Sequence, residues 1–285
     1  VCLGNTPLWV RWRSYVYLIK FDIQMINKIL GPLFTKLPEN NNLERIWVVA
    51  KTDFIKRYYG TSLGIFWALL NPLFRLLIYY TVFTVFFTNR VENFALYLFS
   101  GLLIWMLFTE GTSKGIQILK SKRFLIENIR INKLHIYYAS VLSVLMGFSF
   151  NFLVYIIISL FFHVTYSWYL VFFPLLILML AILIIAVQMI LSIINIYLRD
   201  ITHVWDMVRL LLFWANPIFY PQTIMTEKYP IIPMLNPIAG IIINTRNVIL
   251  YNENPNIQLL IANLTGIIIL FGIGLLLVRR FSHKA

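Results

Sequence analysis

Few residues in this sequence have the types and the spacing that enzymes use. Residues 111–115 read Gly-Thr-Ser-Lys-Gly, but a phosphate-binding loop needs four residues between its glycines and a Lys-Ser or Lys-Thr pair after the second one. The four histidines are scattered without metal-ligand spacing, and the single cysteine, Cys2, cannot form an internal disulfide. The pattern Gly-x-Ser-x-Gly occurs at residues 60–64 and 111–115, but a nucleophile elbow requires a strand before it, and both segments adjoin apolar blocks of helical length. The sequence therefore predicts no catalytic residue, no metal site and no cofactor bound by this chain.

Two charged residues lie within apolar stretches and are candidates for function. Arg75 lies about midway along residues 63–87, and Glu110 lies in the second half of residues 94–118. A charge deep in a membrane is costly and suggests a functional site by default. The alternatives are a structural ion pair, or a long side chain whose charged end reaches the membrane surface. Glu110 could be the partner of Arg75.

The elements that position these residues are apolar helices. The chain of 285 residues is 60% hydrophobic and 12% charged, whereas soluble domains contain about 25% charged residues. Apolar blocks of about 20 residues can cross a bilayer core of roughly 30 Å as helices, and they are too continuous for the strands of an outer-membrane barrel. We predict an all-α membrane protein with six spans, at about residues 63–87, 94–118, 134–162, 169–198, 204–220 and 257–278. The net charge is +13, and most Lys and Arg residues lie between these blocks. This distribution favours anionic lipid over nucleic acid as the partner of the positive residues.

Two segments outside the spans have a recognisable pattern. In residues 43–62, Trp47, Ala50 and Phe54 recur at helical spacing, which predicts an amphipathic helix at the membrane interface, with packing on protein as the alternative. Residues 221–255 contain five prolines and are still partly apolar, which predicts broken helices that re-enter the membrane from outside without crossing it. Residues 1–42 form an N-terminal extension without an assigned role.

The distribution of lysine and arginine predicts the topology. With six spans, 20 of the 24 Lys and Arg residues fall on one side, three fall on the other, and Arg75 lies within a span. Because positive residues accumulate on the cytoplasmic side, both termini are expected in the cytoplasm. A seventh span through residues 221–255 would place the basic C-terminal tail outside.

Three motifs, in this order along the chain, resemble those of type-2 ABC exporter permeases that export polysaccharides. The first, residues 53–64, reads Asp-Phe-Ile-Lys-Arg-Tyr-Tyr-Gly-Thr-Ser-Leu-Gly and leads into Phe-Trp-Ala-Leu-Leu-Asn-Pro. The second is Tyr-Leu-Arg-Asp-Ile at residues 197–201, followed by Phe-Trp and by Asn-Pro-Ile-Phe-Tyr-Pro at residues 216–221. The third is Leu-Asn-Pro at residues 235–237 with Arg246. The likeness covers most of residues 43–280.

The resemblance implies the channel-forming membrane subunit of an exporter of a lipid-linked polysaccharide, such as O antigen, in the bacterial cytoplasmic (inner) membrane. It also implies six spans, a homodimer with one channel at its interface, and two copies of a separate ABC ATPase subunit that binds ATP and Mg²⁺. Teichoic-acid and capsular-polysaccharide exporters share these motifs and remain alternatives. An ion-coupled carrier or a membrane-embedded enzyme is a further alternative, although either would need a cluster of polar or acidic groups at one depth.

Aromatic residues near the ends of the first and fifth predicted spans are candidates for the channel wall. The C–H faces of sugars stack on aromatic rings, and in the family these two spans border the channel. The candidates are Tyr79, Tyr80, Phe83, Phe87, Trp214, Phe219 and Tyr220. The alternative is that these rings are interfacial anchors.

A transport subunit without an ATPase must receive force through its cytoplasmic surface. The basic loop at residues 120–133 combines cations with apolar side chains, a composition suited to docking in a groove; a merely solvated loop is the alternative. The candidate coupling residues are Phe124, Leu125, Glu127 and Arg130 of this loop, with Arg199 and Asp200 of the Tyr-Leu-Arg-Asp motif.

Overall fold

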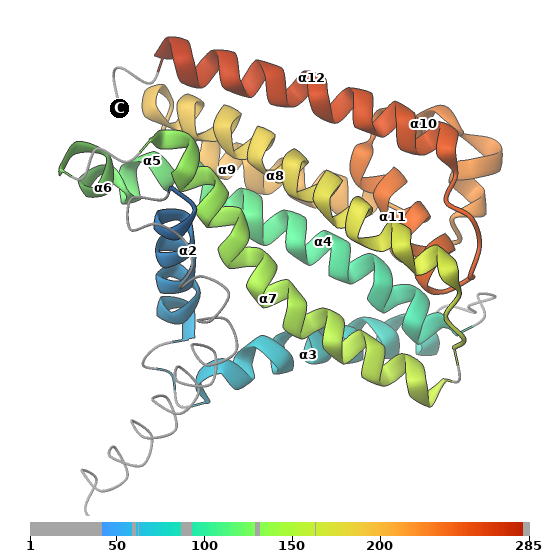
Figure 1. Cartoon of the computed structure of the whole chain (residues 1–285). Coiled ribbons are helices and arrows are strands. Elements are labelled where there is room, and N and C mark those ends of the chain that lie inside the picture. The colour runs from blue at the N-terminus through green and yellow to red at the C-terminus, as the bar shows by residue number, and fades with distance from the viewer. Residues whose placement is uncertain are drawn as a thin grey trace, which may run out of the picture.

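The computed structural model describes residues 42–58, 61, 63–86, 93–128, 132–162 and 164–281, and the regular structure in these residues is entirely helical (Figure 1). This confirms the all-α prediction. Residues 1–41 of the predicted N-terminal extension lie outside the described residues. The α-helices are α2 (Asn42–Tyr58), α3 (Trp67–Phe86), α4 (Phe94–Ile116), α5 (Ile118–Ser121), α6 (Arg123–Asn128), α7 (Lys133–Phe161), α8 (Phe172–Tyr197), α9 (Ile201–Ala215), α10 (Ile231–Leu235), α11 (Pro237–Ile249) and α12 (Ile257–Phe281).

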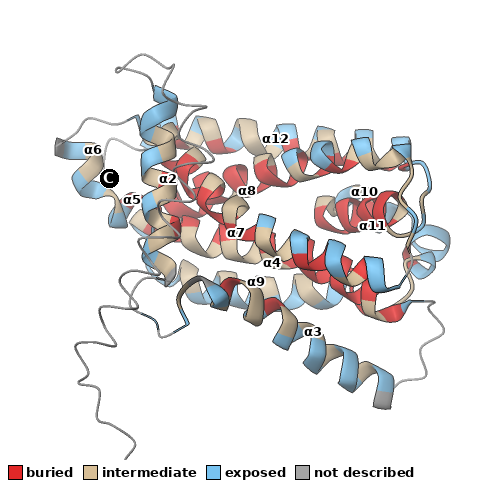
Figure 2. Ribbon diagram, turned by 60° about the horizontal axis from the view of Figure 1, so that its bottom comes forward, coloured by how far each residue is buried: buried red, intermediate tan, exposed pale blue. Residues whose placement is uncertain are grey.

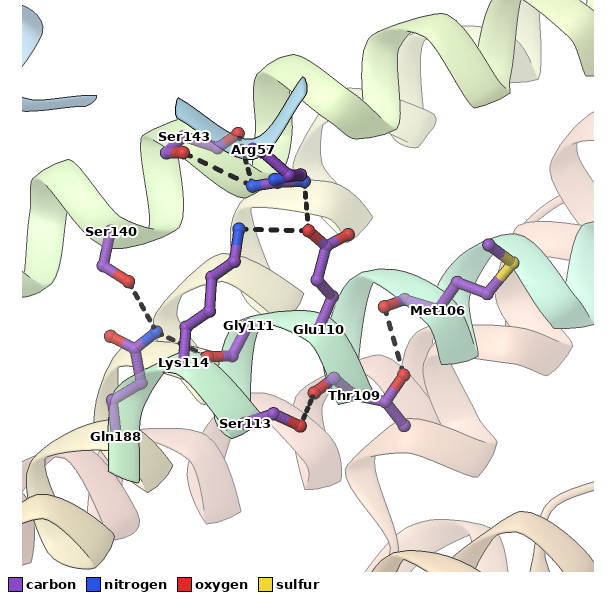
Figure 3. Close-up of polar contacts among 10 residues, drawn as sticks. All are labelled: Arg57, Met106, Thr109, Glu110, Gly111, Ser113, Lys114, Ser140, Ser143 and Gln188. Atoms are coloured by element: carbon purple, nitrogen blue, oxygen red, sulfur yellow. Dashed lines mark hydrogen bonds and ion pairs between the residues drawn. The ribbon is translucent and has the colours of Figure 1, made fainter. Parts of the chain in front are cut away.

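Helix α4 lies at the centre of the bundle and contacts α3, α7, α8, α9 and α11. Figure 2 shows buried residues concentrated in α4, α8 and α11. Two glycines allow α8 to approach α4 closely: a Cβ at Gly115 would lie 2.1 Å from Cγ of Gln188, and a Cβ at Gly111 would lie 2.5 Å from a side-chain carbon of Ile184. Gln188 donates through Nε2 to the carbonyl of Gly111 at 2.9 Å (Figure 3). The Gly-Thr-Ser-Lys-Gly segment is therefore a helix-packing motif of small residues, as is common between membrane helices.

Helix α2 runs across the ends of the long helices rather than along them (Figures 1 and 2). It packs against α7 through Ala50 and Phe54, which are buried, and the Phe54 ring stacks on Phe150 with 5.9 Å between the ring centroids. This part of the predicted apolar face therefore contacts protein, as the alternative interpretation had it, while Leu43 and Val48 are exposed. The helix ends at Tyr58, four residues before the predicted boundary at residue 62.

The segment between α9 and α12 is folded back at the end of the bundle opposite to α2 (Figure 1). Helix α11 begins with a polar cap, because the side-chain oxygen of Asn236 accepts from the backbone N–H of Ile238 at 3.2 Å and Pro237 occupies the first turn. Arg246 of α11 is fully buried and donates to the carbonyls of Tyr97 and Ile218 at 3.1 Å each. It thereby fastens the non-helical residues after α9 to α4.

Four helices of the described part are long and apolar enough to cross a membrane: α4, α7, α12, and α8 together with the 3-10 turn that precedes it. Helix α3 has 20 residues and α9 has 15, and neither is among the four. A 15-residue helix is about 22 Å long, shorter than a bilayer core of roughly 30 Å. The crossing of α3 and α9, and the re-entrant character of residues 221–255, stay predictions.

Candidate substrate cavity

A cavity of about 970 Å³, which we call the basic cavity, lies between α3, α4 and α9. The last turn of α2, Thr61 and Asn151 of α7 complete its wall. Its ionisable lining consists of four cations and two carboxylates, an excess of two positive charges: Arg57, Arg75, Lys114 and Arg209 against Glu110 and Asp206. Aromatic and amide groups supply much of the remaining wall, among them Trp67, Asn71, Tyr79, Trp105 and Phe213.

Helical spacing explains how each element presents these side chains. Residues three or four positions apart share one face of a helix. The lining residues follow this spacing on all three helices: Ala68, Pro72, Arg75 and Tyr79 on α3, Met106, Glu110, Ser113 and Lys114 on α4, and Asp206, Arg209 and Phe213 on α9. On α4, the face that packs on α8 through Gly111 and Gly115 lies beside the face that lines the cavity.

Glu110 is the centre of a cluster that joins three helices (Figure 3). Its carboxylate forms ion pairs with Arg57 of α2 and, at 3.1 Å, with Lys114 one turn further along α4. The guanidinium of Arg57 also donates to the carbonyl and the hydroxyl of Ser143 on α7, at 3.4 Å each. The suggested pair between Arg75 and Glu110 is therefore wrong. Because α2 crosses the end of the bundle, Arg57 lies beside the carboxylate and pairs with it instead.

Helix α9 is fastened to α4 by polar side chains. Arg209 donates to the hydroxyl of Ser113 at 2.5 Å and forms an ion pair with Asp206 on its own helix. The indole N–H of Trp205 donates to the hydroxyl of Thr112 at 3.3 Å. Sequence reasoning missed this pair of charges, although Asp206, Arg209 and Phe213 have the spacing of one helical face.

Arg75 lines the basic cavity as an exposed residue and forms no ion pair with any described residue. It lies on α3, eight residues after the helix begins at Trp67, which places it about 12 Å along the helix axis. The described residues contain no group of three or more His, Cys, Asp or Glu that could hold a metal ion. The lining of the basic cavity combines four cations, two paired carboxylates, amide groups and aromatic rings.

Most of the candidate channel aromatics form one packed cluster between α3 and the residues that follow α9. Phe83 stacks on Phe219 with 4.4 Å between ring centroids, and Tyr79 contacts Phe219 edge-on at 5.3 Å. Phe219 also contacts the ring of Trp214 at 5.5 Å. Tyr79 lines the basic cavity, whereas Phe219 is buried in the packing.

Trp214 of this cluster and the remaining candidate aromatics differ in their surroundings. Tyr80 is 40% exposed and stacks on Phe94 with 6.3 Å between the ring centroids, and Phe94 in turn contacts Phe83 of the cluster at 6.5 Å. Trp214 is 59% exposed on α9. Tyr220 lines a second, apolar cavity of about 410 Å³ with Met225 and Tyr229. Phe87 lies outside the described residues.

Helix α6 and the turn between α8 and α9, which carry the described coupling candidates, lie at the bundle end that α2 crosses (Figure 1). Phe124 on α6 is 69% exposed and Leu125 is half-buried. Glu127 forms an ion pair with Arg123 at 2.6 Å, and Arg199 and Asp200 are exposed in the turn between α8 and α9. Arg130 lies outside the described residues. Their role in coupling stays a prediction.

Comparison with known proteins finds one transporter family and several export permeases that resemble this chain. The family described as "ABC-2 type transporter" matches residues 44–250, which is most of the chain. The chain is 27% identical over 208 residues to the O-antigen export system permease protein RfbA of Myxococcus xanthus, which covers 72% of this chain and 80% of that protein. It is 26% identical over 249 residues to a protein of the same name from Klebsiella pneumoniae, which covers 83% of this chain and 92% of that protein.

Proposed function

The chain belongs to the ABC-2 type transporter family, and we propose that it is the permease subunit of an ATP-driven exporter that moves lipid-linked polysaccharide of the O-antigen type across the cytoplasmic membrane. The observation that carries the proposal is the likeness to O-antigen export permeases over most of this chain and most of theirs. Capsular-polysaccharide and teichoic-acid export remain the alternatives within the same mechanism.

The chemistry of the basic cavity supports transport rather than catalysis. Its walls combine aromatic rings with fixed cations, and its two carboxylates are each paired with a cation. An ion-coupled carrier would need an acidic group that can change its charge during transport, and Glu110 is held by two cations. Aromatic rings offer sugar rings a broad surface for stacking, and the polar ends of tyrosine and tryptophan can bind hydroxyl groups.

The channel in this proposal is bordered by α3 and α9, which meet in the basic cavity. Both helices carry exposed apolar side chains on their outer faces, such as Phe74 and Leu77 on α3 and Met207 and Leu211 on α9. In a bilayer these faces would contact lipid or a second copy of the chain. The proposal is that α3 and α9 complete six spans, that residues 221–255 form a re-entrant unit at the outer surface, and that two copies of the chain form the channel.

The energy for export would come from a separate ABC ATPase in two copies, which would bind ATP and Mg²⁺. The exposed Phe124 on α6 and the turn with Arg199 and Asp200 offer that subunit a contact surface at one end of the bundle. The same end would face the cytoplasm, together with both termini. Cysteines introduced at Asn93 and Ser282 test this arrangement: in intact cells a membrane-impermeant thiol reagent should label the first and not the second, and labelling at Ser282 would refute the topology.

The function is tested by purification and by glycan analysis in the native host. We expect an ABC ATPase to co-purify with the permease, and we expect deletion of the permease to leave lipid-linked glycan on the cytoplasmic side. Structural analysis of the accumulated glycan separates O antigen from capsule or teichoic acid. Normal surface glycan in the deletion strain, without an ATPase in the purified complex, would refute the proposal.

A further inference from the structure

The C-terminal ends of α4 and α8 are joined by one buried amide. Asn195, in the last turn of α8, is 3% exposed and donates through Nδ2 to the carbonyl of Ile116 at 2.8 Å. Ile116 is the last residue of α4, and the last carbonyls of a helix have no partner further along the same helix. The bond therefore fastens the end of α8 to the end of α4.

Lys120, on the short helix α5, completes this arrangement. Its Nζ donates to the backbone carbonyl of Asn195 at 2.7 Å and to the side-chain oxygen of the same residue at 3.3 Å. A lysine is favourable at this place, because it satisfies a terminal carbonyl of α8 and lies at the negative end of the helix dipole. We call Ile116, Lys120 and Asn195 the α5 junction.

The α5 junction lies between two segments that reach the surface at one end of the bundle (Figure 1). On one side, α6 begins three residues after Lys120, and its first turn donates two backbone hydrogen bonds to the carbonyl of Lys122, at 3.0 and 3.2 Å. On the other side, the exposed residues Arg199 and Asp200 follow Asn195 within one turn of chain. Lys120 and Asn195 are 75 positions apart, so the junction links α6 to the α8–α9 turn far more directly than the chain does.

The α8–α9 turn leads into a wall of the basic cavity. Helix α9 starts directly after Asp200, and its residues Asp206, Arg209 and Phe213 line the cavity. A shift of the turn would therefore move this wall. The contact of Lys120 with Asn195 gives α6 a path to α9 that is separate from α2.

From this arrangement we propose that Lys120 is a positioning residue for energy coupling, because it holds α6 and the α8–α9 turn together as one unit. An ATPase that moves α6 would then move the turn and α9 with it. Without Lys120, α6 would follow the ATPase while the turn stayed behind, and ATP would be hydrolysed with little export. The coupling role rests on the proposed function, whereas the rigid link is a property of the permease alone.

The rigid link is tested on the purified permease in nanodiscs, without an ATPase. Spin labels at Glu127 on α6 and at Arg199 in the turn, in a Cys2→Ser background, report the distance between the two segments by pulsed EPR. Lys120→Met should raise the population of displaced distances about tenfold, because it removes a charge-assisted hydrogen bond. Lys120→Arg can donate to both oxygens of Asn195 and should keep the distribution narrow. Arg279→Met, which alters an exposed cation in the last turn of α12, should leave it unchanged.

The coupling role is tested with the full exporter in proteoliposomes, without spin labels. Lys120→Met should retain ATP hydrolysis and lower the glycan exported per ATP about fivefold or more, the lower end of typical coupling effects. Lys120→Arg should restore most of this ratio. If Lys120 only capped α8, its loss would lower Tm and protein level and leave export per ATP unchanged, and that result would overturn the inference.

The two measurements separate this inference from the proposed function. If no glycan is exported and no ATPase binds, the proposed function fails, whereas a distance distribution that depends on Lys120 still supports the rigid link. If export occurs and Lys120→Met keeps a narrow distribution or full export per ATP, only this inference fails.

Discussion

Replacing Arg246 by methionine should destabilise the end of the bundle opposite to α2. The buried guanidinium donates to the carbonyls of Pro217 and Ile218, which belong to the non-helical segment after α9, and to the carbonyl of Tyr97. Loss of the donor leaves the first two carbonyls buried without a partner, at about 1–3 kcal/mol each. Removal of a buried charge offsets part of that cost, so we expect a net loss of roughly 2–4 kcal/mol and a fall in Tm of about 5–15 °C.

The assay is the Tm of detergent-purified protein, followed by size-exclusion chromatography after heating, with Arg279→Met as the exposed control. Gly101→Ala provides an independent test, because its Cβ would lie 2.6 Å from Nη2 of Arg246. This substitution should lower Tm in the wild-type background and should cost clearly less beside Arg246→Met, since the clash is then absent. A Tm for Arg246→Met within about 2 °C of the wild type, or additive effects of the two substitutions, would refute the reasoning.

Three further predictions concern packing, the channel and coupling. Gly115→Val should lower Tm and purification yield, because even a Cβ at this position overlaps Gln188, and Gln188→Ala should recover part of the loss; a stable single variant would contradict the close packing of α4 on α8. Trp214→Ala should reduce export of long glycans at normal protein level, measured from the surface glycan length, since its exposed ring offers stacking surface; a defect that only follows lost protein would make it an anchor. Phe124→Ala should lower permease-stimulated ATPase activity while the protein remains inserted, and unchanged stimulation would exclude α6 as the contact.

The long apolar helices could be predicted closely from sequence. The predicted spans at residues 94–118 and 257–278 correspond to Phe94–Ile116 and Ile257–Phe281, because polar residues delimit each apolar block. The fifth predicted span, residues 204–220, is less accurate: α9 covers Ile201–Ala215, and the chain then leaves the helix. Asn216 and Pro217 lie where the helix ends. Proline removes a helical hydrogen bond, but a hydropathy pattern measures only how apolar the residues are and therefore misses this end.

The candidate site could be predicted residue by residue but not as an arrangement. Arg75 and Glu110 stand out in the sequence because a charge within an apolar block is rare, and both line the basic cavity. Their suggested pairing is wrong, because Glu110 pairs with Arg57 and Lys114 instead. The position of Arg57 depends on the angle at which α2 crosses α7, which the sequence does not reveal. Periodicity tells which residues share a face of α2, but the crossing angle comes from the packing of Ala50 and Phe54 on α7, which involves residues almost a hundred positions away.

The position of α2 also relates the candidate coupling surface to the basic cavity. Lys122, in the turn that precedes α6, forms an ion pair with Asp53 on α2, and one turn later on the same helix Arg57 pairs with Glu110 in the cavity wall. Both acidic partners are half-buried, so these pairs are screened less than pairs in free solvent. Helix α2 cannot shift along α7 without breaking one of these pairs or unstacking Phe54 from Phe150. A displacement of the turn before α6 therefore acts on α2 one turn before Arg57, which holds the carboxylate of the basic cavity.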